Sequence, residues 1–111
     1  MRALLVEDDA LRGRAMKRWL EREGYEVFWR ETAASALEAL MGPTGFDLVS
    51  LDHDLGGAAT GQDVAEAITR MTRELRPARV EVHTGNDAAA DRMLALLRAA
   101  GVDAHRKELG T

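Results

Sequence analysis

Short apolar runs that alternate with helical segments restrict the fold of this chain more than any other feature of its sequence. Five runs of strand length lie at residues 3–6, 25–29, 46–51, 80–83 and 102–105. Each of the first four is followed by a segment of helical period. Strands this short, with few polar interruptions, are typical of a parallel sheet that helices cover on both faces. The sequence therefore predicts an α/β fold.

Four segments between and after these runs carry the signals of helices. The first places Leu11, Ala15, Trp19 and Leu20 on one stripe and ends before Gly24. The third extends from about residue 62 to residue 75. Pro77 stops this third helix. The limits of the second and fourth helices come from residue types that start or stop a helix, namely Thr32, Gly42 and Pro43 for the second and Asp87 and Gly101 for the fourth.

Length and composition exclude several classes of protein. The 111 residues suit one domain with a single core, which we assign to residues 1–111. The net charge of −4 is too acidic for a general nucleic-acid binder, so a nucleic acid is expected only as a substrate with a phosphate end. The chain has no cysteine, and charge appears too early for a signal peptide. No apolar run approaches the roughly 20 residues of a membrane span. We expect a cytoplasmic protein.

Polar residues follow three of the predicted strands. The first run ends in Glu7, Asp8 and Asp9, and the third ends in Asp52, His53 and Asp54. If these strands are neighbours, their carboxylates converge at one edge of the sheet. Carboxylates that share a small site stay ionised only when a cation joins them. Oxygen ligands favour Mg²⁺ or Mn²⁺, while the histidines leave a softer metal open.

The fourth run ends in His83, Thr84, Gly85 and Asn86. An aspartate beside a divalent cation can attack phosphorus, and Asp52 is the best candidate for that nucleophile. The Thr84 hydroxyl could donate to a phosphoryl oxygen, and the amides of residues 85–87 add an anion site at a helix start. Lys107 or Arg106 could supply positive charge.

At these positions the sequence resembles the receiver domains of response regulators. The resemblance rests on LLVEDDALR, FDLVSLDHDLGG, TGQDVAEAI and VEVHTGND, and it spans nearly the whole chain. It implies a doubly wound, five-stranded parallel sheet of the flavodoxin type, in the strand order 2-1-3-4-5. It also implies Glu7 and Asp8 as the acid pair, Asp52 as the phosphoacceptor, the carbonyl of Asp54 as a metal ligand and Thr84 as the switch hydroxyl.

The sequence departs from the usual receiver in several places. Gly56 and Gly57 stand where receivers usually have a proline, and the family's lysine matches Lys107 with a shift of one residue. Asp54 and Asn86 lie at positions that flank the path of the hydrolytic water in receivers. The segments LDHDLGG and VHTGN also resemble a smaller receiver-like group that has been proposed to process cyclic phosphates.

A receiver ends with a fifth helix, whereas this sequence stops about six residues after its last predicted strand. We therefore expect four helices and a missing fifth. Its absence would leave an apolar part of one sheet face uncovered, which predicts a homodimer or a protein partner on that face.

Several candidate residues also have purely structural interpretations. Asp9 and Asn86 are suitable helix caps. His53 and His83 could be hydrogen-bonded residues of a strand end rather than catalysts or metal ligands. The basic residues of the first helix form a solvated face in the simplest interpretation; they are Arg12, Arg14, Lys17, Arg18 and Arg22.

Three functions follow from these patterns. The first is a signalling switch, in which a histidine kinase phosphorylates Asp52 and the change alters contacts with an output protein. The alternative is a metal-dependent phosphoesterase or cyclic-phosphate hydrolase, with Asp52 attacking phosphorus, Asp54 as general acid and base, and His83 assisting. The third is a degenerate receiver that only binds a partner and is indifferent to Mg²⁺.

Overall fold

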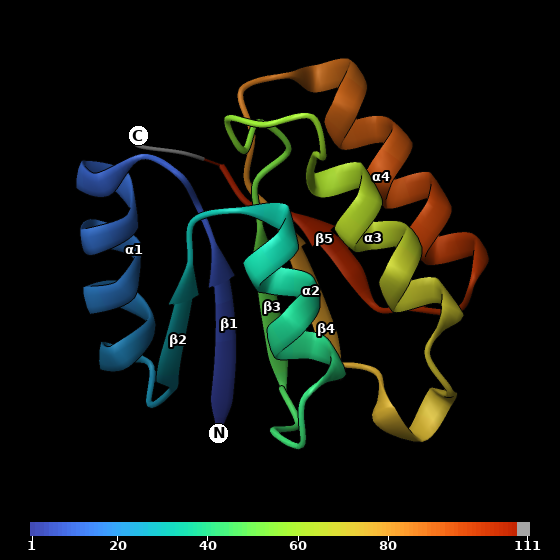
Figure 1. Cartoon of the computed structure of the whole chain (residues 1–111), viewed down its shortest axis with the longest axis horizontal. Helices are drawn as coiled ribbons and strands as arrows, with labels where there is room; N and C mark the ends of the chain where they lie inside the picture. The colour runs from blue at the N-terminus through green and yellow to red at the C-terminus, as the bar shows by residue number, and fades with distance from the viewer. Residues whose placement is uncertain (109–111) are drawn as a thin grey trace.

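Five parallel strands form one sheet in the order β2-β1-β3-β4-β5 (Figure 1). The structure is a computed structural model and describes residues 1–108. Strand order reverses between β1 and β3, which places the switch point of the sheet at their carboxyl ends. This confirms the predicted doubly wound α/β sheet. The strands are β1 (Arg2–Val6), β2 (Glu26–Arg30), β3 (Leu48–Leu51), β4 (Arg79–Val82) and β5 (Ala104–Arg106).

Helices cover both faces of this sheet because alternate strand residues point to opposite sides. Leu4 and Val6 belong to the larger core beneath α2, α3 and α4, whereas Leu5 packs with Met16 and Leu20 of α1. Each fully buried Leu or Val contributes about 1.5–3 kcal/mol relative to an exposed one. The helices are α1 (Ala10–Arg22), α2 (Ala33–Met41), α3 (Gly61–Arg70) and α4 (Asp87–Ala99), with a 3₁₀ turn η1 (Arg73–Leu75).

The buried stripe of α1 differs from the predicted one. Gly13, Met16 and Leu20 are buried, whereas Leu11 and Trp19 are exposed. The reason is Trp29 of β2, because a Cβ at position 13 would lie 2.0 Å from its indole ring. The glycine lets the ring pack directly against the helix backbone and so selects this face of α1.

Helix α3 ends earlier than the sequence predicted. It stops at Arg70 instead of about residue 75, and the turn η1 follows. The side chain of Arg76 provides the reason, since its guanidinium donates to the carbonyls of Thr69, Met71 and Ala100. One side chain thus satisfies carbonyl groups at the ends of α3 and α4 that a continued helix would have bonded itself.

Side chains cap the starts of the helices that follow the strands at this edge of the sheet. The Asp9 carboxylate accepts the amides of Leu11 and Arg12 at 2.9 and 3.2 Å, which confirms the capping interpretation of Asp9. Thr32 caps α2 as predicted. The Asn86 side chain accepts the amide of Ala89 at the start of α4.

On the side of α1, the sheet is polar over β4 and β5. Within residues 1–108 no α-helix follows β5. Glu81 pairs in register with His105, and Lys107 lies 4.0 Å from Glu81 and 3.4 Å above the ring of Trp19. His105 also contacts Asp103 at 2.6 Å. The expectation of an apolar patch here is therefore wrong, because β4 and β5 turn charged side chains to this face. Dimerisation through it stays a prediction.

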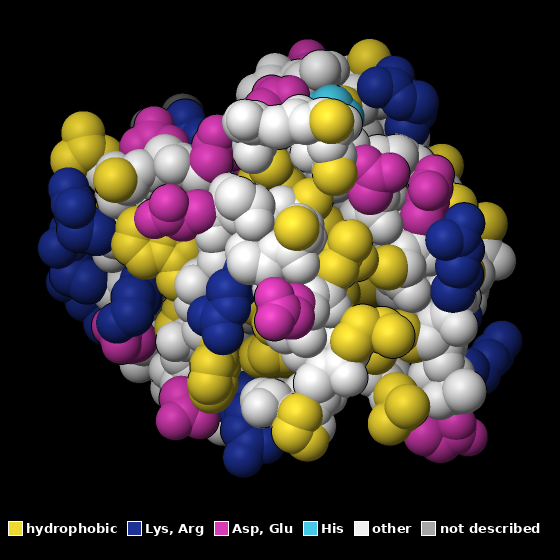
Figure 2. All heavy atoms as spheres, viewed as in Figure 1, with side chains coloured by type: hydrophobic (Ala, Val, Ile, Leu, Met, Phe, Trp, Pro, Cys, Tyr) yellow, Lys and Arg dark blue, Asp and Glu magenta, His cyan; other side chains and the backbone are white. Residues whose placement is uncertain are grey.

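The outer face of α1 carries a concentration of positive charge. Arg14, Arg18 and Arg22 are exposed on this helix, and Figure 2 shows Lys and Arg side chains gathered along it. This agrees with the prediction of a solvated basic face. Across residues 1–108, no helix combines the length and the hydropathy that crossing a bilayer requires.

Candidate functional site

An open cavity of about 570 Å³ lies at the carboxyl ends of β1, β3 and β4. Backbone pairing of β3 with both β1 and β4 brings these strand ends together, although they are far apart in the sequence. The cavity thus lies at the predicted edge of the sheet. Its lining residues are Asp8, Asp9, Arg12, Asp52, Asp54, Thr84, Gly85 and Asn86.

Three carboxylates meet at this cavity. Oxygen atoms of Glu7, Asp8 and Asp52 all lie within 4.8 Å of one another. Glu7 is fully buried and Asp52 is 4% exposed, whereas Asp8 is exposed. Hard oxygen donors at this spacing suit a divalent cation such as Mg²⁺ or Mn²⁺. The structure thus brings together the acids that the sequence predicted to converge.

The two buried acids differ sharply in pKa. Burial alone would raise the pKa of Glu7, but His83, the amide of Asp9 and Arg12 together lower it to about 2. Burial raises the pKa of Asp52 from 3.8 to about 6, and the neighbouring charge of Glu7 adds to this shift. Glu7 is therefore the permanently ionised member of the pair. Asp52 is the acid that takes up a proton first, and it is ionised at neutral pH.

His83 connects Glu7 to a residue that sequence reasoning missed. His83 is fully buried, and its Nδ1 lies 3.0 Å from the hydroxyl of Ser50. Its Nε2 lies 3.2 Å from Glu7 Oε1, an ion-pair distance at an angle unsuited to a hydrogen bond. Ser50 of β3, His83 directly after β4 and Glu7 directly after β1 thus form a buried row. Ser50 gave no signal beyond being one polar residue inside an apolar run.

Arg12 is the second residue that sequence reasoning did not assign to the site. Its guanidinium lies 3.3 Å from both carboxylate oxygens of Glu7 and 3.9 Å from Asp52 Oδ2. It also approaches the carboxylate of the cap residue Asp9 at 3.8 Å. The sequence placed Arg12 among the solvated basic residues of α1. The available signal was the position of Arg12, which lies one turn into the helix that follows the acid pair.

The loop after β3 positions Asp52 and Asp54 differently. The amide of His53 donates to Asp52 Oδ1 at 2.7 Å, which leaves Asp52 Oδ2 towards Arg12. The carboxylate of Asp54 lines the cavity, is mostly exposed, and contacts the ring of His53 at 2.9 Å. Asp54 does not belong to the group of three close carboxylates. The predicted role of its carbonyl as a metal ligand stays a prediction.

Thr84 and Asn86, which follow β4, also line the cavity. Thr84 is 3% exposed, and its hydroxyl accepts the amide of Asn86 at 3.2 Å. The hydroxyl hydrogen is therefore available for an acceptor in the cavity. The side-chain oxygen of Asn86 caps α4, which confirms the structural interpretation of this residue and leaves its amide group to face other partners.

The two basic candidates at the end of β5 pair with carboxylates other than those of the site. Lys107 lies over the ring of Trp19 and 4.0 Å from both Glu23 and Glu81. Arg106 donates to the carbonyl of Thr84 at 3.1 Å and pairs with Asp87. Neither residue lines the cavity. The catalytic role predicted for Lys107 has no support in its contacts.

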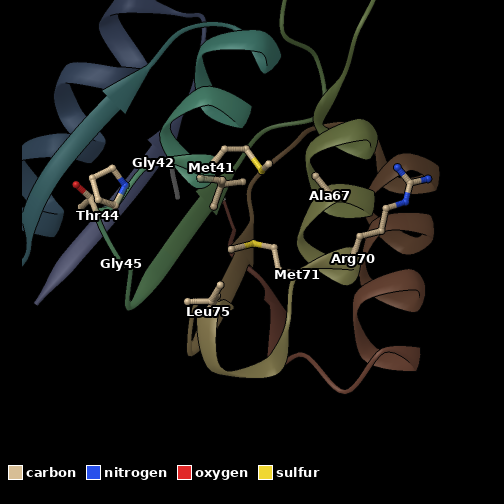
Figure 3. Close-up of a pocket in the computed structure, with 10 residues that line it drawn as sticks. Met41, Gly42, Thr44, Gly45, Ala67, Arg70, Met71 and Leu75 are labelled. Atoms are coloured by element: carbon tan, nitrogen blue, oxygen red, sulfur yellow. The ribbon is translucent and has the colours of Figure 1, made fainter.

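Another cavity, of about 480 Å³, lies between the C-terminal ends of α2 and α3, at the other end of the strands (Figure 3). Its lining is mostly apolar and includes Met41, Met71 and Leu75. Arg70 is the one charged side chain among the lining residues found within residues 1–108. This groove has no cluster of reactive groups, so the acid cavity is the candidate site.

Known proteins similar to this chain include regulators from several bacteria. The alginate biosynthesis transcriptional regulatory protein AlgB of Pseudomonas aeruginosa is 37% identical over 94 residues, which are 85% of this chain and 20% of AlgB. The chain spans at most 24% of the length of the curated relatives that it matches first.

Solved receiver structures share the fold over almost the whole chain. The non-phosphorylated HemR receiver domain of Leptospira biflexa is 33% identical with a TM-score of 0.75, covering 99% of this chain and 83% of that one. A response regulator of Burkholderia pseudomallei, solved with a phosphorylated aspartic acid, a calcium ion and citrate, is 25% identical with a TM-score of 0.74. This match covers 99% of this chain and 60% of the Burkholderia chain.

The match to a known family covers nearly the whole sequence. Residues 2–99 match the cyclic-phosphate processing receiver domain. The chain therefore belongs to the receiver domains of response regulators, within the cyclic-phosphate processing receiver family.

Proposed function

We propose that this domain is a phosphoacceptor switch in which Asp52 receives a phosphoryl group from a partner kinase. The observation that carries this proposal is the position of Asp52. Its buried carboxylate lies within 4.8 Å of the oxygens of Glu7 and Asp8, at a cavity that Thr84 also lines. The Burkholderia regulator with a phosphorylated aspartic acid and a calcium ion supports the same chemistry for this fold.

The same carboxylates fit a divalent cation. Glu7, Asp8 and Asp52 would hold Mg²⁺, and the carbonyl of Asp54 is the further ligand that the family resemblance implies. The pKa of Asp52, raised by burial to about 6, fits this proposal, because a buried acid beside an ionised one gains stability from a cation. When bound, the ion would supply positive charge to the phosphoryl oxygens.

The residues of the chain would share the transfer as follows. Asp52 Oδ2 attacks phosphorus, because Oδ1 is occupied by the amide of His53. The new bond joins Oδ2 to phosphorus, and the bond from phosphorus to the donor breaks, with its electron pair leaving on the donor. Thr84 would donate its hydroxyl hydrogen to a phosphoryl oxygen. The Thr84 oxygen can still accept the amide of Asn86 while it donates, so this hydrogen bond would connect the phosphoryl group to the start of α4.

Acetyl phosphate tests the proposal directly. With Mg²⁺, the wild-type chain should gain the mass of one phosphoryl group, whereas Asp52→Asn should gain none. Asp54→Asn is the matched control, since it removes a carboxylate that lines the same cavity without removing the acceptor. Failure of the folded wild-type chain to incorporate phosphate, at any Mg²⁺ concentration, would refute the switch.

A second function is favoured by one specific observation, the match of residues 2–99 to the cyclic-phosphate processing receiver domain. We propose as the alternative that the site opens cyclic phosphates. Asp52 Oδ2 would attack phosphorus, and the ring P–O bond would break as Asp54 protonates the leaving alkoxide. Water would then cleave the bond from Asp52 to phosphorus and return a proton to Asp54.

Turnover of a 2′,3′-cyclic nucleotide distinguishes the two functions. The hydrolase should produce a monophosphate with many turnovers, and Asp52→Ala and His83→Gln should both lose this activity. The switch should release no product beyond one equivalent. Asp87→Asn is a control for surface charge at the start of α4, where the carboxylate does not line the cavity.

A further inference from the structure

Arg12 lies where a phosphoryl group on Asp52 would need positive charge. We infer that the guanidinium of Arg12, rather than a lysine after the last strand, binds the oxygens of that group. The inference rests on the proposed phosphorylation of Asp52. It begins from the distance of 3.9 Å between Arg12 Nη1 and Asp52 Oδ2, the oxygen that the amide of His53 leaves open.

The contacts of Lys107 explain why the role falls to another residue. Its ammonium group lies 3.4 Å above the ring of Trp19, with Glu23 and Glu81 both at 4.0 Å. A cation over an indole face gains about 0.5–2 kcal/mol, and the two carboxylates add to that attraction. Lys107 therefore has its own partners on the polar sheet face. Among the cavity-lining residues in the described part of the chain, Arg12 is the one base.

The position of Arg12 suits an anion that arrives from solvent. Its backbone is held in the first turn of α1, where its amide donates to the cap residue Asp9 at 3.2 Å. Its side chain is 41% exposed, so the guanidinium reaches the acids from the open side of the cavity. A guanidinium also presents paired N–H donors to two oxygens of a phosphoryl group, which an ammonium cannot do.

Arg12 and a metal ion would use the same carboxylates, and this sets the direction of each effect. Without a metal, Nη1 lies 3.3 Å from both oxygens of Glu7. A cation that binds Glu7 must compete with this contact, so removal of the guanidinium should strengthen metal binding. The same removal should weaken binding of a phosphoryl group. A purely structural role of Arg12 would weaken both.

The experiment compares Mg²⁺ alone with Mg²⁺ plus beryllofluoride, an analogue of the phosphoryl group. Calorimetry measures the Mg²⁺ affinity, and fluorine NMR measures the beryllofluoride complex at fixed Mg²⁺. In Arg12→Gln we expect Mg²⁺ to bind as tightly as in the wild type or more tightly, and beryllofluoride to bind at least about tenfold more weakly. Arg12→Lys should restore part of that loss. Arg14→Gln, an exposed change of the same charge on α1, should leave both affinities unchanged.

Three results would overturn the inference. If Arg12→Gln binds beryllofluoride as the wild type does, while Asp52→Asn loses it, the phosphorylation site stands and Arg12 is not its cation. A loss in Lys107→Gln without one in Arg12→Gln leads to the same conclusion. If the folded wild-type chain binds no beryllofluoride with Mg²⁺, the proposed function fails and the role of Arg12 fails with it.

Discussion

Replacing Asp52 by Asn should stabilise the metal-free protein at neutral pH. Asp52 is 4% exposed, and burial together with the charge of Glu7 raises its pKa from 3.8 to about 6. A raised folded pKa means that the ionised form destabilises the fold. The shift of about two pKa units corresponds to roughly 3 kcal/mol at pH 7, since each unit is about 1.4 kcal/mol. Asn keeps the oxygen that accepts the amide of His53 and removes the charge.

The pH dependence gives this prediction its sign. Below about pH 4, Asp52 is protonated in both the folded and the unfolded chain, so the variant has no advantage there. The cost of ionising Asp52 grows between about pH 4 and pH 6 and is complete above that range. The stability of the wild type relative to Asp52→Asn should therefore fall across this window and then stay constant.

Urea titrations without divalent cations, at a series of pH values, measure the difference. Asp91→Asn is the matched control, because Asp91 is exposed on α4 and its loss should change stability by less than about 0.5 kcal/mol. If Asp52→Asn is no more stable than the wild type at pH 7, the carboxylate is not destabilised by its surroundings. A gain that is the same at pH 4 and pH 7 would likewise contradict an origin in ionisation.

Further predictions concern the metal and two close approaches of the backbone. Mg²⁺ affinity, measured by calorimetry, should fall as the pH drops below about 6, because protonation of Asp52 competes with the ion; a pH-independent affinity would exclude Asp52 as a ligand. Gly61→Ala should lower the free energy of unfolding in urea by about 2 kcal/mol or more, since its Cβ would lie 2.0 Å from the carbonyl oxygen of Asp52. An unchanged unfolding midpoint would show that the loop after β3 can move away from the added methyl group without loss of stability. Gly13→Ala should destabilise the fold by a similar amount and alter tryptophan fluorescence, because the added methyl meets the ring of Trp29; fluorescence identical to the wild type would contradict that contact.

Much of the fold could be predicted because its signals are local. Apolar runs located all five strands, and cap residues such as Asp9 and Thr32 marked helix starts. The buried face of α1 could not be predicted from the helix alone, because it depends on Trp29 of β2, whose ring packs against Gly13. The end of α3 was wrong for a similar reason, since Arg76 reaches back to its carbonyls from beyond the turn.

The candidate site also contains some residues that could be placed from the sequence and others that could not. Strand-end acids can be placed from sequence, because parallel strands deliver their carboxyl ends to one edge. The partners of those acids cannot, because side chains of Arg12 and Lys107 reach their positions through tertiary contacts. Both are basic residues near a strand end or helix start, yet one contacts Glu7 and the other lies over Trp19. Family resemblance favoured Lys107, and the packing of the polar sheet face placed it elsewhere.

The row of Ser50, His83 and Glu7 restricts how this sequence can drift over evolutionary time. Each side chain is buried and faces the next, so an aliphatic residue at position 83 would leave the Ser50 hydroxyl without its side-chain partner and Glu7 with only Arg12 and the amide of Asp9. Substitutions at these three sites should therefore be inherited as a set. In homologous domains that lack a histidine at the position of His83, we expect the residue at the position of Ser50 to differ as well, and the residue at the position of Glu7 to have other contacts.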